Sequence, residues 1–315
     1  MLAALRNEQL QQLQPITWRP FLFHLSKRDD RDALCHLLAE NAGSIQLCDT
    51  LIGQLRDLIR TRHPARKLSA TQLDSLTEGH LGRVAADEYG VWAYYPWSRR
   101  LVHVLDKSEF AELRTNRNRY KITADEQAIL ATKRVGVVGL SVGQSVAATL
   151  ALERSFGELR LADFDCVDLS NLNRIRAVIH NIELPKVYFT AREIAEIDPY
   201  LDVTLFPNGI TPENAEEFLV GGGKLDVLVE ECDSLDIKIL VRQCARRQRI
   251  PVVMHTSDRG MLDIERFDRE PNRPIFHGLA GNLDPDALCS LTSEQKVPYV
   301  LRILGSETLS SRMRA

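Results

Sequence analysis

Cysteine is scarce in this sequence of 315 residues, and its six copies are scattered. No two of them form a CxxC motif, which excludes a zinc ribbon and a disulfide framework and predicts a cytoplasmic protein. Long apolar runs are also absent. No stretch approaches the ~18 apolar residues of a membrane span, and the first ten residues contain no apolar run like that of a signal peptide. We therefore expect no membrane association.

Neither sign of charge is in large excess. The sequence contains 40 Lys and Arg residues and 43 Asp and Glu residues. The resulting net charge of −3 gives no overall attraction to a polyanion. A basic cluster does occur, formed by Arg56, Arg60, Arg62, Arg66 and Lys67. We interpret it as a solvated helix end, because few aromatic residues interleave and no nucleic-acid recognition motif is visible. A nucleic-acid partner is not expected.

The first 113 residues lack the strand and helix alternation seen later in the chain. Apolar residues at a three/four spacing predict an amphipathic helix over Ser44–Arg62. Alternating apolar residues over Gly90–Asp106 predict a β-hairpin around Pro96. Residues 1–113 are thus expected to form an N-terminal, mainly helical domain with a hairpin.

From Lys133 onward, strands and helices alternate, which predicts an α/β fold with a Rossmann-like, doubly wound, mostly parallel sheet. Strands are predicted at 134–139, 159–163, 203–206, 226–229 and 251–254, helices at 186–197 and 235–247, and an antiparallel strand at 261–267. Ligands of such sheets bind beyond the carboxyl ends of the strands. Ligand-binding and catalytic residues are therefore expected directly after each strand.

Two of these strand ends carry features of a nucleotide site. Gly139 ends the first strand and opens the turn into a helix, whose N-terminal N–H groups would face a phosphate. Asp163 ends the second strand 24 residues later, close to the ~20 expected of an acid that binds a ribose. Only Gly139 matches the Rossmann glycine pattern, since Ser141 and Gln144 occupy the other two positions. On this stretch alone, a phosphate-binding turn and an ordinary tight turn both remain open.

Four stretches with charged residues follow the predicted strands, at 163–165, 168–174, 184–186 and 231–234. A nicotinamide enzyme needs no Arg, Lys and second Asp around the phosphates, whereas an enzyme that attacks the α-phosphate of ATP does. Arg174 and Lys186 can neutralise a triphosphate, and Asp233 can hold Mg²⁺ where charge accumulates on the pyrophosphate leaving group. We interpret these stretches as an ATP and Mg²⁺ site rather than as solvated loop charges.

The sequence at 163–174, DFDCVDLSNLNR, and the later Pro185-Lys186 resemble the DFDxVxLSNLxR and PK motifs of ThiF/MoeB-type adenylating enzymes. This superfamily includes the ubiquitin-activating enzymes, and the resemblance covers residues 112–268, about half of the chain. It implies an adenylation domain at 114–283, followed by a helical tail at 284–315. It also implies ATP-dependent adenylation of a carboxylate, with a protein or peptide C-terminus as the expected acceptor and an acyl-adenylate and pyrophosphate as products.

The resemblance also implies roles for individual residues. The nucleotide-binding positions are Gly139, Ser141, Gly143, Asp163, Asp165, Asn171, Arg174 and Lys186. Asp163 would bind the ribose, Asn171, Arg174 and Lys186 the phosphates, and Asp233 the Mg²⁺. Arg117, in a segment similar to the family's RYxRQ, corresponds to an arginine finger that in this family often comes from the partner subunit. Arg117, Arg174, Lys186 and Asp233 are therefore the expected catalytic residues, and a homodimer is the expected assembly.

The glycine turn departs from the family's GxGGxG pattern. Ser141 and Val142 replace two glycines, so the Val142 side chain must point away from the phosphates or close the site. A closed site would make the chain a non-catalytic interaction protein built on a decayed adenylation fold. An NAD-binding oxidoreductase is a further alternative. Asp233-Ser234, Lys238 and residues 246–251 are also similar to the tRNA threonylcarbamoyladenosine dehydratases of the same superfamily.

Two questions concern thiols and the end of the chain. Cys166, Cys232, Cys244 and Cys289 are candidates for a thioester-forming cysteine, although a free structural thiol is the favoured interpretation because the sequence places no His beside them. Residues 284–315 have helical apolar spacing and end without a capping signal. We expect this tail to lead into a further domain, as in bacterial proteins that join an adenylation domain to a nitroreductase-like domain.

Overall fold

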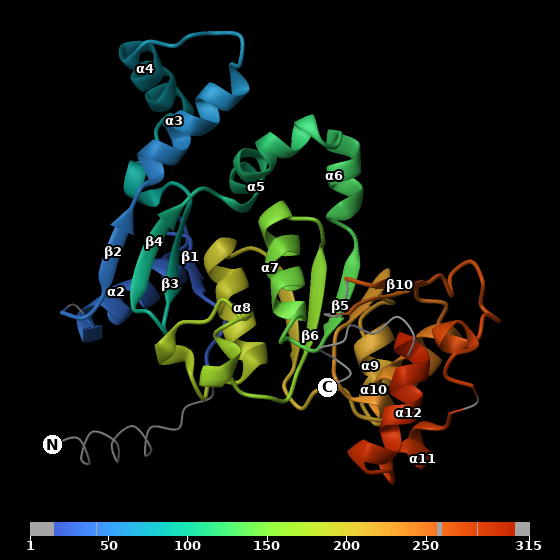
Figure 1. Ribbon diagram of the computed structural model, residues 1–315. Coiled ribbons are helices and arrows are strands. Elements are labelled where there is room, and N and C mark those ends of the chain that lie inside the picture. Colours follow the sequence, from blue (N-terminus) through green and yellow to red (C-terminus); the bar gives the residue numbers. More distant parts are fainter. Residues whose placement is uncertain (1–15, 42, 257–259, 282, 306–315) are drawn as a thin grey trace, which may run out of the picture. The chain divides into compact units, whose positions relative to one another are not determined.

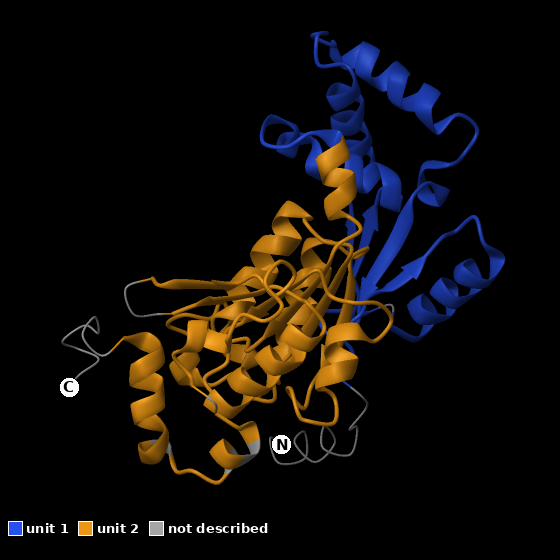
Figure 2. Ribbon diagram, turned by 90° about the vertical axis from the view of Figure 1, so that its right-hand side faces the viewer, with its two compact units in different colours: residues 1–124 blue, residues 125–315 orange. Residues whose placement is uncertain are grey.

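The computed structural model describes residues 16–41, 43–256, 260–281 and 283–305. The chain forms two compact units, residues 1–124 and 125–315 (Figure 2). The first unit extends to residue 124 and includes helix α5 (Lys107–Thr115), whose Phe110 and Leu113 pack against Leu51, Leu55, Leu58 and Leu105. The domain boundaries expected at 113 and 283 remain predictions.

Four strands form the sheet of the N-terminal unit, in the order β1-β3-β4-β2. They are β1 (Phe21–Phe23), β3 (Val91–Tyr95), β4 (Arg100–Val104) and β2 (Gln46–Asp49). The antiparallel pair β3 and β4 is the hairpin expected over residues 90–106. The unit also contains the helices α2 (Arg28–Asn41), α3 (Leu51–Arg62), α4 (Ala70–Leu81) and α5.

The helix expected over Ser44–Arg62 is wrong in its first part. Residues Gln46–Asp49 form β2, whose backbone pairs in parallel with β4, and α3 begins only at Leu51. Pairing with a strand about fifty residues away overrides the local helical spacing, because sheet formation depends on neighbours more than on intrinsic preference. The helices of this unit therefore accompany a four-stranded sheet and not a hairpin alone.

Three residues of the basic cluster around α3 are paired with acidic neighbours in the same unit. Arg62 donates to Glu112, with 2.7 Å between Nη2 and Oε2, and Arg60 contacts Asp57 one helical turn earlier. Arg56 forms an ion pair with Asp74 of α4. This pairing agrees with a solvated helix end and leaves less positive charge available for a polyanion.

Six strands form the sheet of the C-terminal unit, in the order β10-β9-β8-β5-β6-β7. They are β5 (Arg134–Val138), β6 (Glu158–Ala162), β7 (Asp202–Phe206), β8 (Val227–Glu230), β9 (Val252–His255) and β10 (Leu262–Glu265). All neighbours pair in parallel except β10, which is antiparallel to β9. The expected Rossmann-like sheet is confirmed. Its strand order reverses between β5 and β8, where folds of this class bind ligands.

Helices cover both faces of this sheet (Figure 1). α7 (Gly143–Glu153) and α8 (Lys186–Ile197) lie on one face, and α9 (Ala215–Val220) and α10 (Leu235–Arg247) lie on the other. The unit begins with α6 (Ala124–Leu130) and continues after the sheet with α11 (Pro285–Cys289) and α12 (Ser293–Leu304). Leu288 of α11 and Ile303 of α12 join the hydrophobic core on the α10 side of the sheet. Within the described residues, no helix is long and apolar enough to cross a membrane.

The end of β5 meets the end of β8 at Gly139. This residue has a φ of +85°, and a Cβ atom placed on it would lie 2.6 Å from the backbone nitrogen of Cys232. Glycine alone satisfies both the left-handed backbone and the close approach of the other chain segment. Four residues later, a Cβ on Gly143 would lie 2.7 Å from Cγ1 of Val137, so α7 can pack closely on β5 only with glycine there.

We predict that Gly139→Ala lowers the free energy of unfolding by about 3 kcal/mol or more, because backbone atoms must shift in addition to the left-handed strain. Gly222→Ala is the matched control. Gly222 also has a positive φ, of +67°, but its missing Cβ faces open space, so only the strain of about 1 kcal/mol is expected.

Urea unfolding followed by far-ultraviolet circular dichroism measures both variants. Tryptophan fluorescence is unsuitable, since Trp18, Trp92 and Trp97 all lie in the N-terminal unit. Equal losses of unfolding free energy in the two variants would show that the close contact between the ends of β5 and β8 does not exclude a Cβ atom at residue 139.

Candidate functional site

The carboxylate of Asp163 holds together the turn after β5 and the loop after β6. Its Oδ2 accepts a hydrogen bond from the Leu140 backbone N–H at 2.6 Å, and its Oδ1 accepts one from the Asp165 N–H at 2.8 Å. The side chain is buried, which raises the pKa of Asp163, although the two backbone donors partly offset this effect. Asp163 thus fixes the position of the glycine turn.

Lys186 lies beside this turn. It is only 4% exposed, and its Nζ lies 2.9 Å from Oδ2 of Asp165 and 3.1 Å from Oγ of Ser141. Its own backbone N–H donates to the carbonyl of Asp165 at 2.8 Å, which anchors the start of α8 to the same loop. A nearly buried ammonium is stable only with anionic or polar partners, and here the Asp165 carboxylate provides the charge.

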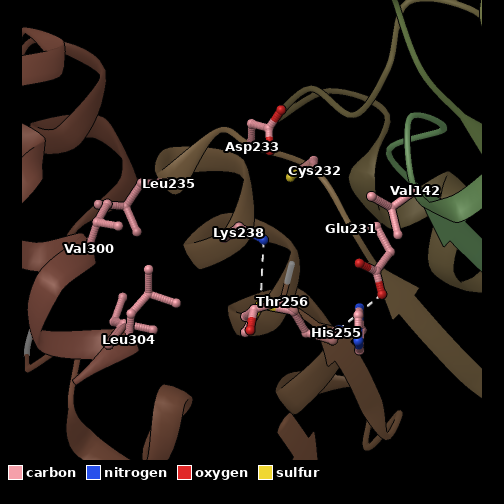
Figure 3. Close-up of a pocket in the computed structure, with 12 residues that line it drawn as sticks. Val142, Glu231, Cys232, Asp233, Leu235, Lys238, His255, Thr256, Val300 and Leu304 are labelled. Carbon is pink, nitrogen blue, oxygen red and sulfur yellow. Dashed lines mark hydrogen bonds between the residues drawn. The ribbon is translucent and has the colours of Figure 1, made fainter. Parts of the chain in front are cut away.

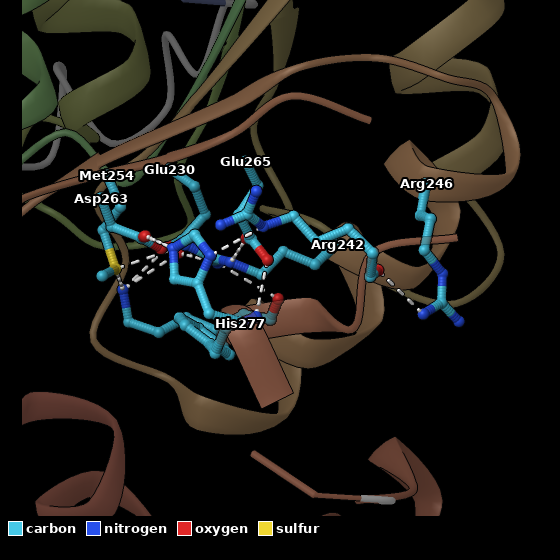
Figure 4. Close-up of polar contacts among 10 residues, drawn as sticks. Glu230, Arg242, Arg246, Met254, Asp263, Glu265 and His277 are labelled. Carbon is cyan, nitrogen blue, oxygen red and sulfur yellow. Dashed lines mark hydrogen bonds and ion pairs between the residues drawn. The ribbon is translucent and has the colours of Figure 1, made fainter. Parts of the chain in front are cut away.

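The residues after β8 are held by a buried ionic network (Figure 4). Arg242 of α10 is fully buried and contacts the carboxylates of Glu230 and Glu265, and Lys238 donates to Glu230 at 3.0 Å. Burial alone would raise the pKa of Glu230, but the charges of Arg242 and Lys238 outweigh it and lower that pKa. Glu230 Oε1 also accepts the Cys232 N–H at 2.9 Å. The network therefore fixes the loop that carries Asp233.

Two cavities adjoin this loop. A strand-end cavity of about 460 Å³ extends over the ends of β5, β6 and β8, where Gly139, Asp163 and Asp233 line it. An apolar chamber of about 230 Å³ lies toward β9 and α12 (Figure 3). Both cavities share the wall formed by Glu231, Cys232, Asp233, Leu235 and Val300. Groups bound in the two cavities would meet at this wall.

The two residues that replace family glycines face different cavities. Ser141 lines the strand-end cavity and accepts from Lys186, whereas Val142 lines the apolar chamber. The Val142 side chain therefore points away from the strand-end cavity. Gly143 is buried at the start of α7 and serves the packing of this helix on β5.

Not every expected site residue lies at these cavities. Of the expected set, Gly139, Ser141, Asp163, Asp165 and Asp233 line the strand-end cavity, and Lys186 contacts two of them. Asn171 and Arg174 are not among the residues that line either cavity. Asn171 is buried and accepts the Asp168 N–H at 3.1 Å, while Arg174 is exposed and donates to the Ser170 carbonyl. Arg117 is exposed in η2 (Asn116–Tyr120) of the N-terminal unit.

Several cavity residues were assigned no role in the sequence analysis. Phe164, in the middle of the DFD motif, is 70% exposed and lines the strand-end cavity with Ile210. Glu231 belongs to both cavities and accepts the His255 N–H at 3.0 Å, and burial raises its pKa. Phe164 and Glu231 could have been found from their positions directly after predicted strands. Val300 could not, since only the tertiary fold brings α12 to the site.

The described cysteines do not form an activated nucleophile at this wall. Burial, and then the charge of Glu230, raises the pKa of Cys232 well above its ordinary value. Burial also raises the pKa of Cys244. Both thiols are therefore poor sources of thiolate. Cys166 is exposed, and the side chain of Cys289 lies outside the described residues.

The donors present fit a magnesium ion that is shared with a nucleotide. Among the described residues, no group of three or more His, Cys, Asp or Glu side chains is arranged to hold a metal by itself. Mg²⁺ does not require such a group, because it is commonly held by one or two carboxylates together with substrate phosphates and water. Asp233 is exposed and lines the strand-end cavity, so it offers one such carboxylate.

These features define a Rossmann-like α/β domain with a site at the switch in strand order. The chain belongs to the ThiF family, whose sequence profile matches residues 114–304. It is 55% identical over 224 residues to an uncharacterized protein, MT1398, of Mycobacterium tuberculosis, which covers 71% of this chain and 31% of the relative.

Relatives with named activities are more distant. A tRNA threonylcarbamoyladenosine dehydratase of Bacillus subtilis is 30% identical over 48% of this chain and 59% of its own length. A molybdopterin-synthase adenylyltransferase of Haemophilus influenzae is 27% identical over 62% of this chain and 81% of its own length. The crystal structure of the Escherichia coli dehydratase TcdA with ATP has a TM-score of 0.44 and 26% identity, over 48% of this chain and 62% of that chain. This chain thus spans about a third of MT1398 and less than two thirds of either dehydratase.

We predict that Asp163→Ala lowers the free energy of unfolding by about 2–4 kcal/mol, because it leaves the N–H groups of Leu140 and Asp165 without their acceptor. Asp163→Asn, which keeps one acceptor oxygen, should lose about half as much. Asp233→Ala is the control, since Asp233 is exposed and a change within about 0.5 kcal/mol is expected. Urea unfolding measures the free energy of unfolding of all three variants. An unchanged value for Asp163→Ala would contradict the bridging role of this carboxylate.

Proposed function

We propose that the C-terminal unit activates a carboxylate with ATP. A carboxylate oxygen of the acceptor forms a bond to the α-phosphorus of ATP while the bond from that phosphorus to the pyrophosphate oxygen breaks. The products are an acyl-adenylate and pyrophosphate. The observation that carries this proposal is the placement of two charged residues. Lys186 is nearly buried beside the glycine turn, and Asp233 is exposed on the lining of the strand-end cavity.

Lys186 supports a triphosphate because its ammonium is already held at the turn. It contacts Ser141 and Asp165, both of which line the strand-end cavity. A fixed cation stabilises negative charge more effectively than a mobile surface lysine, since little reorganisation is needed when the charge develops. Asp165 balances this cation when no phosphate is bound.

Asp233 is the residue that would hold Mg²⁺. The ion, when bound, supplies Lewis-acid stabilisation of charge on the phosphate oxygens. The chain's own contribution is to hold the Asp233 loop still, through the bond from Cys232 N–H to Glu230 and the buried Arg242 behind it. We infer that the acceptor approaches from the other side of the same wall.

The acceptor is proposed to be a protein or peptide C-terminus. This is supported by a relative whose name states that it activates a protein modifier, a ubiquitin-like modifier-activating enzyme of Bombyx mori that is 26% identical over 44% of this chain. Arg117, Asn171 and Arg174 stay predicted phosphate ligands. A homodimer in which Arg117 serves the partner's site is part of the same proposal, and a C2 interface would present this arginine to both sites.

Three other functions compete with this proposal. The similarity to tRNA threonylcarbamoyladenosine dehydratases favours a tRNA-linked substrate, which pyrophosphate exchange with tRNA in place of a peptide would reveal. Membership of the ThiF family and the Lys186 and Asp233 positions weigh against an NAD-dependent oxidoreductase. The direction of Val142, away from the strand-end cavity, weighs against a decayed site.

We predict that the protein binds Mg·ATP and not NAD, and that Asp233→Ala abolishes metal-dependent pyrophosphate exchange while keeping most of the ATP affinity. The reason is that Mg²⁺ stabilises charge mainly in the transition state. Asp125→Ala, an exposed residue of α6 outside both cavities, is the matched control and should exchange normally. Calorimetry measures binding. Micromolar NAD affinity without ATP heat would overturn the proposal.

A second prediction concerns the turn itself. Ser141→Gly should weaken ATP binding by about 1 kcal/mol, the scale of one hydrogen bond, because it removes the hydroxyl next to Lys186. Val142→Gly should change ATP affinity little, because Val142 faces the apolar chamber. Calorimetric titration of both variants and their double variant tests this. A large gain in ATP affinity on restoring the glycines would identify the natural turn as obstructed and the chain as non-catalytic.

A further inference from the structure

The apolar chamber is lined by six apolar side chains, four of which do not line the strand-end cavity. Leu235, Met254, Val300, Ile303 and Leu304 line it together with Val142 (Figure 3). They come from the loop after β5, the start of α10, the end of β9 and one side of α12. A concave set of apolar side chains from four separate elements favours an apolar occupant.

Two of the charged side chains at this chamber, Lys238 and Glu231, already have partners within the protein. The Lys238 ammonium is held by both oxygens of Glu230, at 3.0 and 3.1 Å, and contacts the Met254 sulfur. The Glu231 carboxylate accepts the His255 backbone N–H at 3.0 Å. The cation nearest to the apolar lining, Lys238, is thus already neutralised by Glu230, whereas an apolar group would contact six apolar side chains.

The wall shared by the two cavities indicates how the acceptor is oriented, with its carboxylate at the wall and its neighbouring side chain in the apolar chamber. A carboxylate that reacts with a nucleotide in the strand-end cavity must reach Glu231–Asp233, which belongs to both cavities. The apolar chamber then receives the group next to that carboxylate. Its volume of about 230 Å³ exceeds the ~150 Å³ of an apolar cavity that holds a benzene molecule, so one large side chain fits.

We propose that the apolar chamber is the acceptor-specificity site and takes a large apolar side chain on the residue that bears the reacting carboxylate. The acceptor is then a peptide or protein that ends in a residue such as leucine, rather than one that ends in glycine. This inference rests on the proposed carboxylate activation. α12 forms one wall and is tied to α10 by the Lys296–Asp236 ion pair, at 3.0 Å.

Direct binding of two short probes tests this chamber. N-acetyl-glycyl-leucine and N-acetyl-glycyl-glycine differ only in the terminal side chain. Calorimetry measures their affinities in the presence of saturating Mg²⁺ and α,β-methylene-ATP, so that no adenylate forms during the titration. We expect the leucine peptide to bind at least about tenfold more tightly, the gain expected for burying one leucine side chain. Pyrophosphate exchange should show the same preference.

Ile303→Phe is the variant that fills the chamber, because Ile303 is 8% exposed and lines it. We expect it to remove the preference for leucine while ATP affinity stays unchanged. Val297→Phe is the matched control, since Val297 is on the same helix, is 47% exposed and lines neither cavity. Ile303→Ala, which enlarges the chamber, should instead shift the preference toward N-acetyl-glycyl-phenylalanine. Circular dichroism verifies that each variant is folded.

The outcomes separate the two proposals. If ATP binds and the two peptides bind equally, or if Ile303→Phe and Ile303→Ala both leave the leucine preference intact, the chamber is not the specificity site while nucleotide binding stands. If ATP does not bind, the proposed activation fails. The chamber assignment then survives only if the peptide preference persists without ATP and is lost in Ile303→Phe.

Discussion

The site depends on one carboxylate that joins two strand ends. Asp163 accepts the N–H groups of Leu140 and Asp165, so the turn after β5 and the loop after β6 keep a fixed relation. Asp165 in turn holds the ammonium of Lys186. Removing the carboxylate would therefore disturb the glycine turn and the position of the buried cation together. Asp163 has a structural role whether or not it also contacts a ribose.

A second support lies across the switch in strand order. The buried network of Arg242 with Glu230 and Glu265 holds the end of β8, and Glu230 accepts the N–H of Cys232. Replacing such a network by apolar residues can leave stability unchanged, so its value here is in position rather than in energy. It places the Glu231–Asp233 wall between a strand-end cavity and an apolar chamber. Under the proposed function, this wall would separate the nucleotide from the acceptor.

The sequence predicted the parts of the fold that local pattern determines. The parallel sheet and the helix at Lys186–Ile197 follow from periodicity and from Pro185, and the fold class is confirmed. Residues 46–49 were mispredicted because their pairing with β4 is long-range. Long-range tertiary packing also explains which features of the site could not be predicted from the sequence. The sequence could not show that Val142 turns into a second cavity, that Arg174 is exposed away from both cavities, or that α12 walls the chamber.

The most direct test of the central claim is a crystal structure of the protein with Mg²⁺ and α,β-methylene-ATP, an analogue that cannot release pyrophosphate. We expect the phosphates to lie at the Gly139 turn within reach of Lys186, Asp233 to contact the metal, and the apolar chamber to stay free of nucleotide. A nucleotide bound elsewhere, or one whose base occupies the apolar chamber, would contradict the account.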